Sequence, residues 1–303
     1  MNFGVLGYGK IVREQIAPAF AQTAHQIVSV GSRSGRRPAG YAGVVHDSYA
    51  DCINDQQVEA IYIATPNHLH VPLSIQALTA GKPVLCEKPA ALSADEFAQL
   101  EAAQAETGVA YQEAFMVEHH PQWIDLEAEA LGGNRLLHTS FTYGPRKSTD
   151  VRSHAELGGG VWYDIGCYGL WACYRFGARH LRRVSGTFRT QDGVCVHAQF
   201  TLEFDELDAQ IEVGSLHWRQ QSLTLVTKQE RIDVPWPFNP EGPVIQQITD
   251  QDGSRQAEFE GNQYANMLND FAQHCDSGQF LYHDRSAHIA AWSDQILLEI
   301  GKN

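Results

Sequence analysis

The sequence predicts two domains: an α/β domain with a doubly wound parallel sheet, followed by an α+β domain rich in antiparallel strands. The chain has 303 residues, which is enough for two hydrophobic cores at roughly 150 residues per domain. Up to about residue 117, short apolar runs alternate with helical patterns, which is typical of parallel strands joined by helices. Beyond that residue the spacing changes to strands that follow one another closely, which favours antiparallel pairing.

The first domain is expected to contain short buried strands, because its apolar runs are too short for surface helices. The helix expected from residue 94 has a clear start signal, because Ser93 followed by Glu96 fits a capping box. The expected strands are residues 3–6, 27–31, 60–64, 84–87 and 110–114, and the expected helices are residues 10–20, 69–80 and 94–107.

The second domain is expected to combine strands with a few helices. Helices are expected over residues 121–131 and from about Tyr163, and strands over residues 136–143 and in an antiparallel meander over 181–234. A structured proline loop is expected over residues 235–243. Two helices then close the chain, because apolar residues recur at helical spacing. The stripes expected to face the core are Tyr264, Met267, Leu268 and Phe271, then Ile289, Trp292, Ile296 and Ile300.

Composition excludes several classes of function. With 22 Lys+Arg against 36 Asp+Glu, the formal net charge is −14, and such a surface repels a nucleic-acid backbone. The six cysteines form no C-x-x-C pair, so neither a disulfide framework nor a zinc site is expected. No apolar run reaches the roughly 18 residues of a membrane helix, and a strand pattern begins at once in place of a charged leader. A cytoplasmic protein without nucleic-acid or membrane partners is therefore expected.

A glycine-rich turn, residues 7–12 with the sequence GYGKIV, lies between the first expected strand and the first helix. The first glycine permits a tight turn, the second lets a pyrophosphate approach the backbone, and the helix N-terminus supplies N–H donors. Val12 replaces the third Gly or Ala of the motif, so a purely structural turn is the alternative. The residues expected to bind a dinucleotide here are Gly7, Tyr8, Gly9, Lys10 and Ile11.

The end of the second expected strand indicates which dinucleotide is bound. An NAD site usually presents Asp or Glu there, which binds the ribose hydroxyls. Residues 31–37 instead read GSRSGRR, with no carboxylate. Arginine forks suit a phosphate, which a carboxylate would repel, so the segment predicts NADP in preference to NAD. A solvated basic loop is the alternative. The residues that carry the prediction are Ser32, Arg33, Arg36 and Arg37.

Three further motifs carry a family resemblance. Residues 64–70 read ATPNHLH, residues 81–89 read GKPVLCEKP, and residues 158–168 read GGGVWYDIGCY. Together with the glycine turn they resemble the glucose–fructose oxidoreductase and inositol dehydrogenase family, often written Gfo/Idh/MocA. The strand-borne Glu-Lys-Pro is the most specific of these marks. The resemblance covers nearly the whole chain and is specific for fold and reaction type, but not for substrate.

The resemblance implies a Rossmann domain over residues 1–117 that binds NADP, and a substrate-binding and oligomerisation domain over 118–303. The second domain would have a large, mostly antiparallel open sheet, and the last helix could pack back on the first domain. Family members commonly associate through that sheet, so a homodimer or homotetramer is expected. The further cofactor-binding residues that the resemblance implies are Ala64, Thr65, Asn67, His70, Glu87 and Lys88.

The same resemblance implies a catalytic set. Lys88 would occupy the catalytic lysine position, followed by a proline that is often cis, Pro89 in this chain. Tyr168 stands where inositol dehydrogenases have His, whereas the glucose–fructose oxidoreductase, dihydrodiol dehydrogenase and aldose dehydrogenase branches have Tyr, as this chain does. A phenol has an unperturbed pKa of about 10, so as general acid and base it needs a neighbouring cation, which Lys88 could supply. Asp164 would orient the substrate hydroxyl or Lys88. Alternatively, Tyr168 packs a helix and Asp164 caps it.

The expected function is NADP-dependent transfer of a hydride between nicotinamide and a hydroxyl or carbonyl carbon of a sugar, polyol or diol. Two other classes stay open: a non-catalytic dinucleotide sensor of the same fold, and a glycosidase that uses nicotinamide transiently. Glu118 faces either the substrate cleft or solvent, and Arg152 marks either a substrate contact or the surface. Adjacent His119 and His120 do not easily share one ion and no His-x-x-x-His pair occurs, so no metal site is expected.

Overall fold

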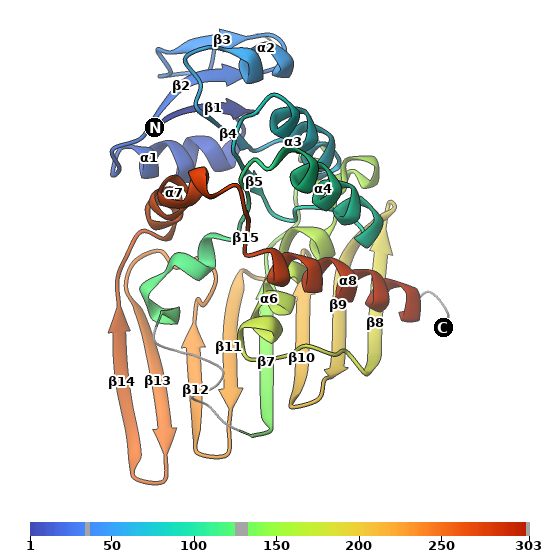
Figure 1. The fold of residues 1–303 in the computed structure, drawn as a ribbon. Helices are drawn as coiled ribbons and strands as arrows, with labels where there is room; N and C mark the ends of the chain where they lie inside the picture. Colours follow the sequence, from blue (N-terminus) through green and yellow to red (C-terminus); the bar gives the residue numbers. More distant parts are fainter. Residues whose placement is uncertain (34–36, 125–132, 301–303) are drawn as a thin grey trace. The chain divides into compact units, whose positions relative to one another are not determined.

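The computed structural model of the protein describes residues 1–33, 37–124 and 133–300, and the chain divides into two compact units (Figure 1). The first unit combines Met1–His119 with Asn262–Ser286, and the second combines His120–Gly261 with Ala287–Asn303. The division differs from a single boundary after residue 117, because the chain returns to the first unit near its C-terminal end.

The first unit contains a seven-stranded sheet in the order β15-β6-β5-β4-β1-β2-β3, with every neighbouring pair parallel. The strands expected from the sequence are all present close to their expected bounds. Two short strands, β3 and β15, were not expected, because runs of two or three residues carry no periodicity. The strands are β1 (Asn2–Leu6), β2 (Gln26–Gly31), β3 (Val44–His46), β4 (Ala60–Ile63), β5 (Val84–Glu87), β6 (Tyr111–Ala114) and β15 (Phe280–Leu281).

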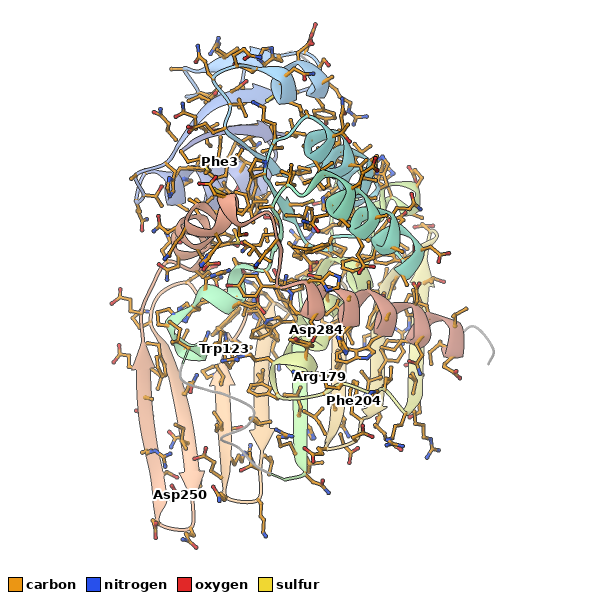
Figure 2. All side chains as sticks on the ribbon, viewed as in Figure 1. Phe3, Trp123, Arg179, Phe204, Asp250 and Asp284 are labelled. Atoms are coloured by element: carbon orange, nitrogen blue, oxygen red, sulfur yellow. The ribbon has the colours of Figure 1, made fainter. Side chains whose placement is uncertain are left out.

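Helices cover both faces of this sheet, with α3 and α4 on one side and α1 and α7 on the other (Figure 1). Phe3 of β1, labelled in Figure 2, packs against Phe20 of α1 and Phe271 of α7, with ring centroids 5.1 and 5.9 Å away. Ser93 caps α4 as expected, because its Oγ accepts a hydrogen bond from the Glu96 N–H. The helices are α1 (Ala17–Phe20), preceded by a π-helical turn over Val12–Ile16, α2 (Tyr49–Asn54), α3 (His70–Thr79), α4 (Ala94–Thr107) and α7 (Gln263–His274).

The second unit contains an eight-stranded sheet in the order β14-β13-β12-β11-β7-β10-β9-β8. Its neighbouring strands are antiparallel except for β7 and β10, which are parallel. The expected meander is therefore interrupted, because β7 comes from earlier in the chain and lies between β10 and β11. The strands are β7 (Arg135–Thr142), β8 (Arg183–Gln191), β9 (Val194–Glu203), β10 (Leu207–Gly214), β11 (Gln220–Val226), β12 (Glu230–Pro235), β13 (Val244–Asp250) and β14 (Gly253–Phe259).

Helix α6 (Cys167–Arg175) and the second-unit part of α8 (His283–Ile300) lie on the same side of this sheet (Figure 1). Trp292 of α8 packs against Phe204 at the end of β9, with ring centroids 4.9 Å apart; Phe204 is labelled in Figure 2. The two C-terminal apolar stripes face the core as expected, except that Ile300 is half-buried. Of the helix expected over 121–131, Pro121–Trp123 form a 3₁₀ turn, and residues 125–131 lie outside the described residues.

Candidate active site

The glycine turn lies at the carboxyl ends of three parallel strands. Gly7 follows β1 with a φ of +84°, its N–H donates to the Gly31 carbonyl at the end of β2, and a Cβ on it would lie 2.8 Å from the Ala64 carbonyl oxygen. Only glycine fits this position. Nothing within 4 Å would meet a Cβ on Gly9, so its backbone is open to a ligand. The first helix begins at Lys10, as a phosphate site at a helix N-terminus requires.

The loop after β4 lies beside this turn. Thr65 follows Ala64, and its hydroxyl oxygen is buried without a hydrogen-bond partner among the described residues. Asn67 begins a short 3₁₀ turn that leads into α3. A buried hydroxyl without a partner is uncommon, because it loses its bond to water. The orphaned hydroxyl and the open turn both fit a polar ligand at this edge of the sheet.

The basic segment after β2 is only partly described, because Arg36 lies outside the described residues. Arg33 is exposed just beyond the strand, and the Ser32 N–H donates to the His46 carbonyl. Arg37 donates from one guanidinium nitrogen to the carbonyls of Tyr41 and Gly43, at 3.2 and 2.6 Å. Arg37 therefore holds its own loop, and Arg33 is the better candidate for direct contact with a phosphate.

Residues 87–90, called the lysine loop below, follow β5 and contain Lys88. The Lys88–Pro89 peptide bond is cis. The Tyr62 hydroxyl donates to the Glu87 carboxylate, so this predicted cofactor-binding side chain is held from β4. Burial raises the pKa of Tyr62 far above its ordinary value, and the neighbouring Glu87 charge adds to the increase, so Tyr62 stays a donor.

His70 joins the lysine loop to the loop after β4. Its Nδ1 lies 2.8 Å from the Pro89 carbonyl oxygen and its Nε2 lies 3.0 Å from the Thr65 carbonyl oxygen. The ring is 1% exposed, and this burial lowers its pKa, so the neutral form is favoured and donates to one of the two carbonyls. His70 thus braces two loops, and its effect on a cofactor would be indirect.

In the second unit, Asp164 lies in a π-helical turn over Trp162–Gly166. Its Oδ2 accepts hydrogen bonds from the Arg152 Nε at 2.6 Å and the Tyr143 hydroxyl at 3.0 Å. These three residues are called the aspartate cluster below. Burial, followed by the Asp164 charge, raises the pKa of Tyr143, and the same charge raises the pKa of Arg152. Asp164 is therefore a fixed carboxylate with two donors on one oxygen.

Tyr168 begins the first turn of α6 and is 2% exposed. Its ring packs against Phe141 of β7 and Phe238 of the proline loop, with centroids 5.7 and 5.3 Å away. The proline loop lies between β12 and β13, as expected. These two aromatic contacts hold the Tyr168 ring in place.

Two residues of uncertain sequence-based role have defined partners. The Glu118 Oε2 accepts a hydrogen bond from the buried Arg285, and the Glu118 side chain is 15% exposed. Arg152, whose side chain is 35% exposed, pairs with Asp164 and with Asp150, the latter at 3.3 Å. Arg285 lies far from Glu118 along the chain, and a turn separates Asp164 from Arg152. Neither pairing can therefore be seen in the sequence.

Sequence reasoning also missed Tyr143 and Glu113. Tyr143 follows β7, and its place at the end of an expected strand was a usable signal. Glu113 lies in β6, whose four residues are all buried, and is 2% exposed. A charged residue in a strand of an expected parallel sheet predicts a buried partner, because a buried charge must be compensated.

Across the described ranges, no group of three or more His, Cys, Asp or Glu side chains is arranged to hold a metal ion. Among the helices described, none combines the length and apolar character needed to cross a bilayer.

Fold and site together define a two-unit oxidoreductase of the nicotinamide-dependent kind, and comparison with known proteins supports this. Residues 1–115 match the oxidoreductase family with an NAD-binding Rossmann fold, and residues 126–233 match the Gfo/Idh/MocA C-terminal domain. The chain belongs to the Gfo/Idh/MocA oxidoreductase family, as the sequence motifs predicted.

The relatives with named activities include sugar dehydrogenases and reductases and also trans-1,2-dihydrobenzene-1,2-diol dehydrogenases. D-xylose 1-dehydrogenase (NADP(+)) 2 of Haloferax volcanii is 30% identical over 260 residues, which is 82% of this chain and 80% of that protein. An uncharacterized oxidoreductase of Rhizobium meliloti, ORF334, is 35% identical over 61% of this chain, and the match spans 58% of that protein. The crystal structure of KijD10, a 3-ketoreductase from Actinomadura kijaniata in complex with NADP and TDP-benzene, has a TM-score of 0.89. It is 26% identical, with 98% of this chain and 97% of that chain covered.

Proposed function

We propose that this protein uses NADP to transfer a hydride to or from a hydroxyl or carbonyl carbon of a sugar, polyol or diol. The observation that carries the proposal is the lysine loop, which presents Lys88 at the carboxyl edge of the parallel sheet, where such folds bind ligands. The first unit would hold the cofactor and the second unit the substrate.

The residues present fit a dinucleotide. Gly7 and Gly9 leave room for a pyrophosphate at the helix N-terminus, and the orphaned Thr65 hydroxyl is a ready partner for a polar group. No carboxylate follows β2 directly, and the exposed Arg33 suits the additional phosphate of NADP. The names of the xylose dehydrogenase and of the KijD10 complex, which both include NADP, support the same choice.

Hydride transfer itself is the chemistry that a bound nicotinamide supplies. In the oxidative direction, the Tyr168 phenolate oxygen takes the proton of the substrate hydroxyl, and in reduction the Tyr168 hydroxyl gives a proton to the carbonyl oxygen. The Lys88 ammonium donates a hydrogen bond to the substrate oxygen and stabilises the charge that develops there. Asp164, fixed by Arg152 and Tyr143, accepts a hydrogen bond from a second substrate hydroxyl and so orients the sugar.

Two coarser proposals accompany this one. The cysteines, Cys52, Cys86, Cys167, Cys173, Cys195 and Cys275, are all free and buried, which supports a reducing compartment such as the cytoplasm. The large open sheet of the second unit supports a homodimer or homotetramer, by analogy with relatives.

The experiment is a panel of aldoses, polyols, diols and keto sugars, assayed by nicotinamide absorbance with NADP and NAD in parallel. We expect turnover of at least one sugar-like substrate and a specificity constant about tenfold or more higher with NADP than with NAD. Lys88→Ala is expected to lower kcat by about 10²- to 10⁴-fold, whereas Lys228→Ala, at an exposed lysine, should not.

Arg33→Ala tests the cofactor choice, and Arg37→Ala is its matched control because Arg37 donates to its own loop. Loss of the NADP preference in the Arg33 variant supports the proposal. Absence of NADP(H) binding to the wild type, or unchanged turnover in Lys88→Ala, would overturn it.

A further inference from the structure

We propose that Glu113 is a positioning residue for Lys88: its carboxylate holds the end of the lysine loop and thereby sets where the ammonium lies. The inference rests on the proposed function, in which Lys88 takes part in the reaction. Glu113 itself is given no contact with substrate or cofactor.

The first observation is a hydrogen bond at the end of the lysine loop. The Ala90 N–H donates to the Glu113 Oε1 at 2.7 Å, and both residues are buried. Glu113 lies opposite Cys86 in the parallel pairing of β5 with β6, so its side chain starts next to the strand that leads to Lys88. Because Pro89 has no N–H, Ala90 carries the first backbone donor after the lysine.

The second observation is that the other carboxylate oxygen is fixed as well. The Glu113 Oε2 accepts a hydrogen bond from the Ser286 hydroxyl at 2.5 Å and lies 3.3 Å from the Arg285 Nη2. Arg285 is 1% exposed, and its Cζ lies 4.6 Å from the ring centroid of Phe115. With both oxygens held, the carboxylate cannot rotate away from Ala90.

The third observation is the position of this contact among the anchors of the lysine loop. Tyr62 of β4 holds the Glu87 carboxylate, His70 of α3 lies against the Pro89 carbonyl, and Glu113 of β6 holds the Ala90 N–H. The residues on both sides of Lys88 are thus bound by buried side chains from three different elements. Removing the Glu113 contact frees the segment that follows the lysine and leaves a buried N–H without its acceptor.

Glu118 provides an internal comparison. Both Glu113 and Glu118 pair with Arg285, so both compensate its buried charge. Of the two, Glu113 is the one that contacts the lysine loop. If the two carboxylates only compensated the charge of Arg285, substitutions of Glu113 and Glu118 would have similar effects on kcat. If Glu113 positions the lysine loop, its substitution by a residue that cannot accept from Ala90 should lower kcat more.

The test uses the whole protein and compares variants that keep the acceptor for the Ala90 N–H with variants that remove it. Glu113→Gln keeps an oxygen that can accept from Ala90 but loses the charge, and Glu118→Gln loses the charge without touching the loop. The double variant Glu113→Met/Arg285→Met removes the acceptor together with the fully buried charge it compensates; Glu118 loses the same partner, but its side chain is 15% exposed and keeps access to water. Glu113→Ala is the second variant without an acceptor.

We expect both glutamine variants to keep kcat within about threefold of wild type, because the Ala90 contact persists in each. The double variant should lose about 30-fold or more in kcat with little change in the KM for NADP, because Lys88 no longer lies where the reaction needs it. Its pH profile should also shift, because the substrate oxygen would lose the fixed cation that stabilises its charge.

Lys88→Ala, assayed beside these variants, separates the two proposals. If Lys88→Ala keeps wild-type turnover, the assignment of Lys88 fails and the proposed function with it. If Lys88→Ala is inactive but either folded variant without the acceptor matches Glu118→Gln in kcat and pH profile, the positioning role of Glu113 is overturned alone.

Discussion

The lysine loop and the aspartate cluster are built in different ways. Every anchor of the lysine loop is a buried side chain on a regular element, such as Glu113 on β6. The aspartate cluster depends on charge instead, with Asp164 in a π turn and Arg152, whose side chain is 35% exposed, in a 3₁₀ turn. The difference teaches that one functional group is placed by buried side-chain hydrogen bonds and the other by a partly exposed ion pair. Substitutions in the lysine loop should therefore lower activity and stability together, whereas substitutions in the aspartate cluster should lower activity with little change in stability.

The largest effect outside the lysine loop is expected at Tyr168, on helix α6, which follows the π turn of Asp164. Tyr168→Phe keeps the ring that packs on Phe141 and Phe238 but removes the proton-transferring hydroxyl. We expect kcat to fall by about 10²- to 10³-fold, with a melting temperature near that of wild type. Steady-state kinetics and thermal unfolding measure the two effects. Tyr174→Phe, on the same helix, is the matched control, and equal kcat values in both variants would refute the acid/base assignment.

A smaller effect is expected at Arg152. Arg152→Gln removes the charged donor from Asp164, and a lost charge-assisted hydrogen bond corresponds to about 1.5–3 kcal/mol, or roughly 10- to 100-fold in kcat/KM. Stability should change little, because the pair is partly exposed. Asp150→Asn removes the other carboxylate partner of Arg152 and should leave kcat/KM close to wild type. A large loss of stability in Arg152→Gln would contradict the proposed difference between the aspartate cluster and the lysine loop.

The smallest effect is expected on the pH dependence of stability, through His119 of the first unit. Burial lowers the pKa of His119 to about 4, with Asp270 opposing the decrease and Arg285 adding to it. Between about pH 6.5 and pH 4 the unfolded chain binds a proton here that the folded chain does not, so stability falls as the pH falls. His119→Gln should reduce that loss by about 2 kcal/mol, as measured by urea unfolding at pH 7 and pH 4.5.

His274 contacts the same Asp270 carboxylate from the surface, at 3.4 Å, and is 47% exposed. His274→Gln is therefore the control for His119→Gln. A pH dependence that is the same in both variants would contradict the assignment to the buried ring.

The sequence predicted the parts of the molecule that local pattern determines. The run at 84–87 is apolar and short, and it forms β5 with Lys88 directly after it. Ser93 and Glu96 predicted the start of α4 because a capping box is a local hydrogen-bond pattern. The motif that contains Asp164 and Tyr168 was identified by its resemblance to the family, and the π turn before α6 was not predicted.

Contacts between distant residues could not be predicted. Glu113 and Arg285 are separated by most of the second unit's sequence, so neither shows its partner locally. Strand β14 is largely polar and exposed, and in β13 the exposed Ile245 is apolar while the buried Gln246 is polar, so neither strand shows the apolar alternation that identifies a strand. The parallel pairing of β7 with β10 depends on the whole sheet, and no local signal reports it.

The discontinuity of the first unit limits how this protein can be cut. Strand β15 covers the edge of β6, and Phe271 of α7 packs on Phe3 of β1. A chain truncated near residue 117 would expose the unpaired backbone edge of β6, which favours aggregation. It would also lose the packing of α7 against the sheet. Exchange of the nucleotide-binding unit between relatives must therefore transplant two separate stretches of the gene product together.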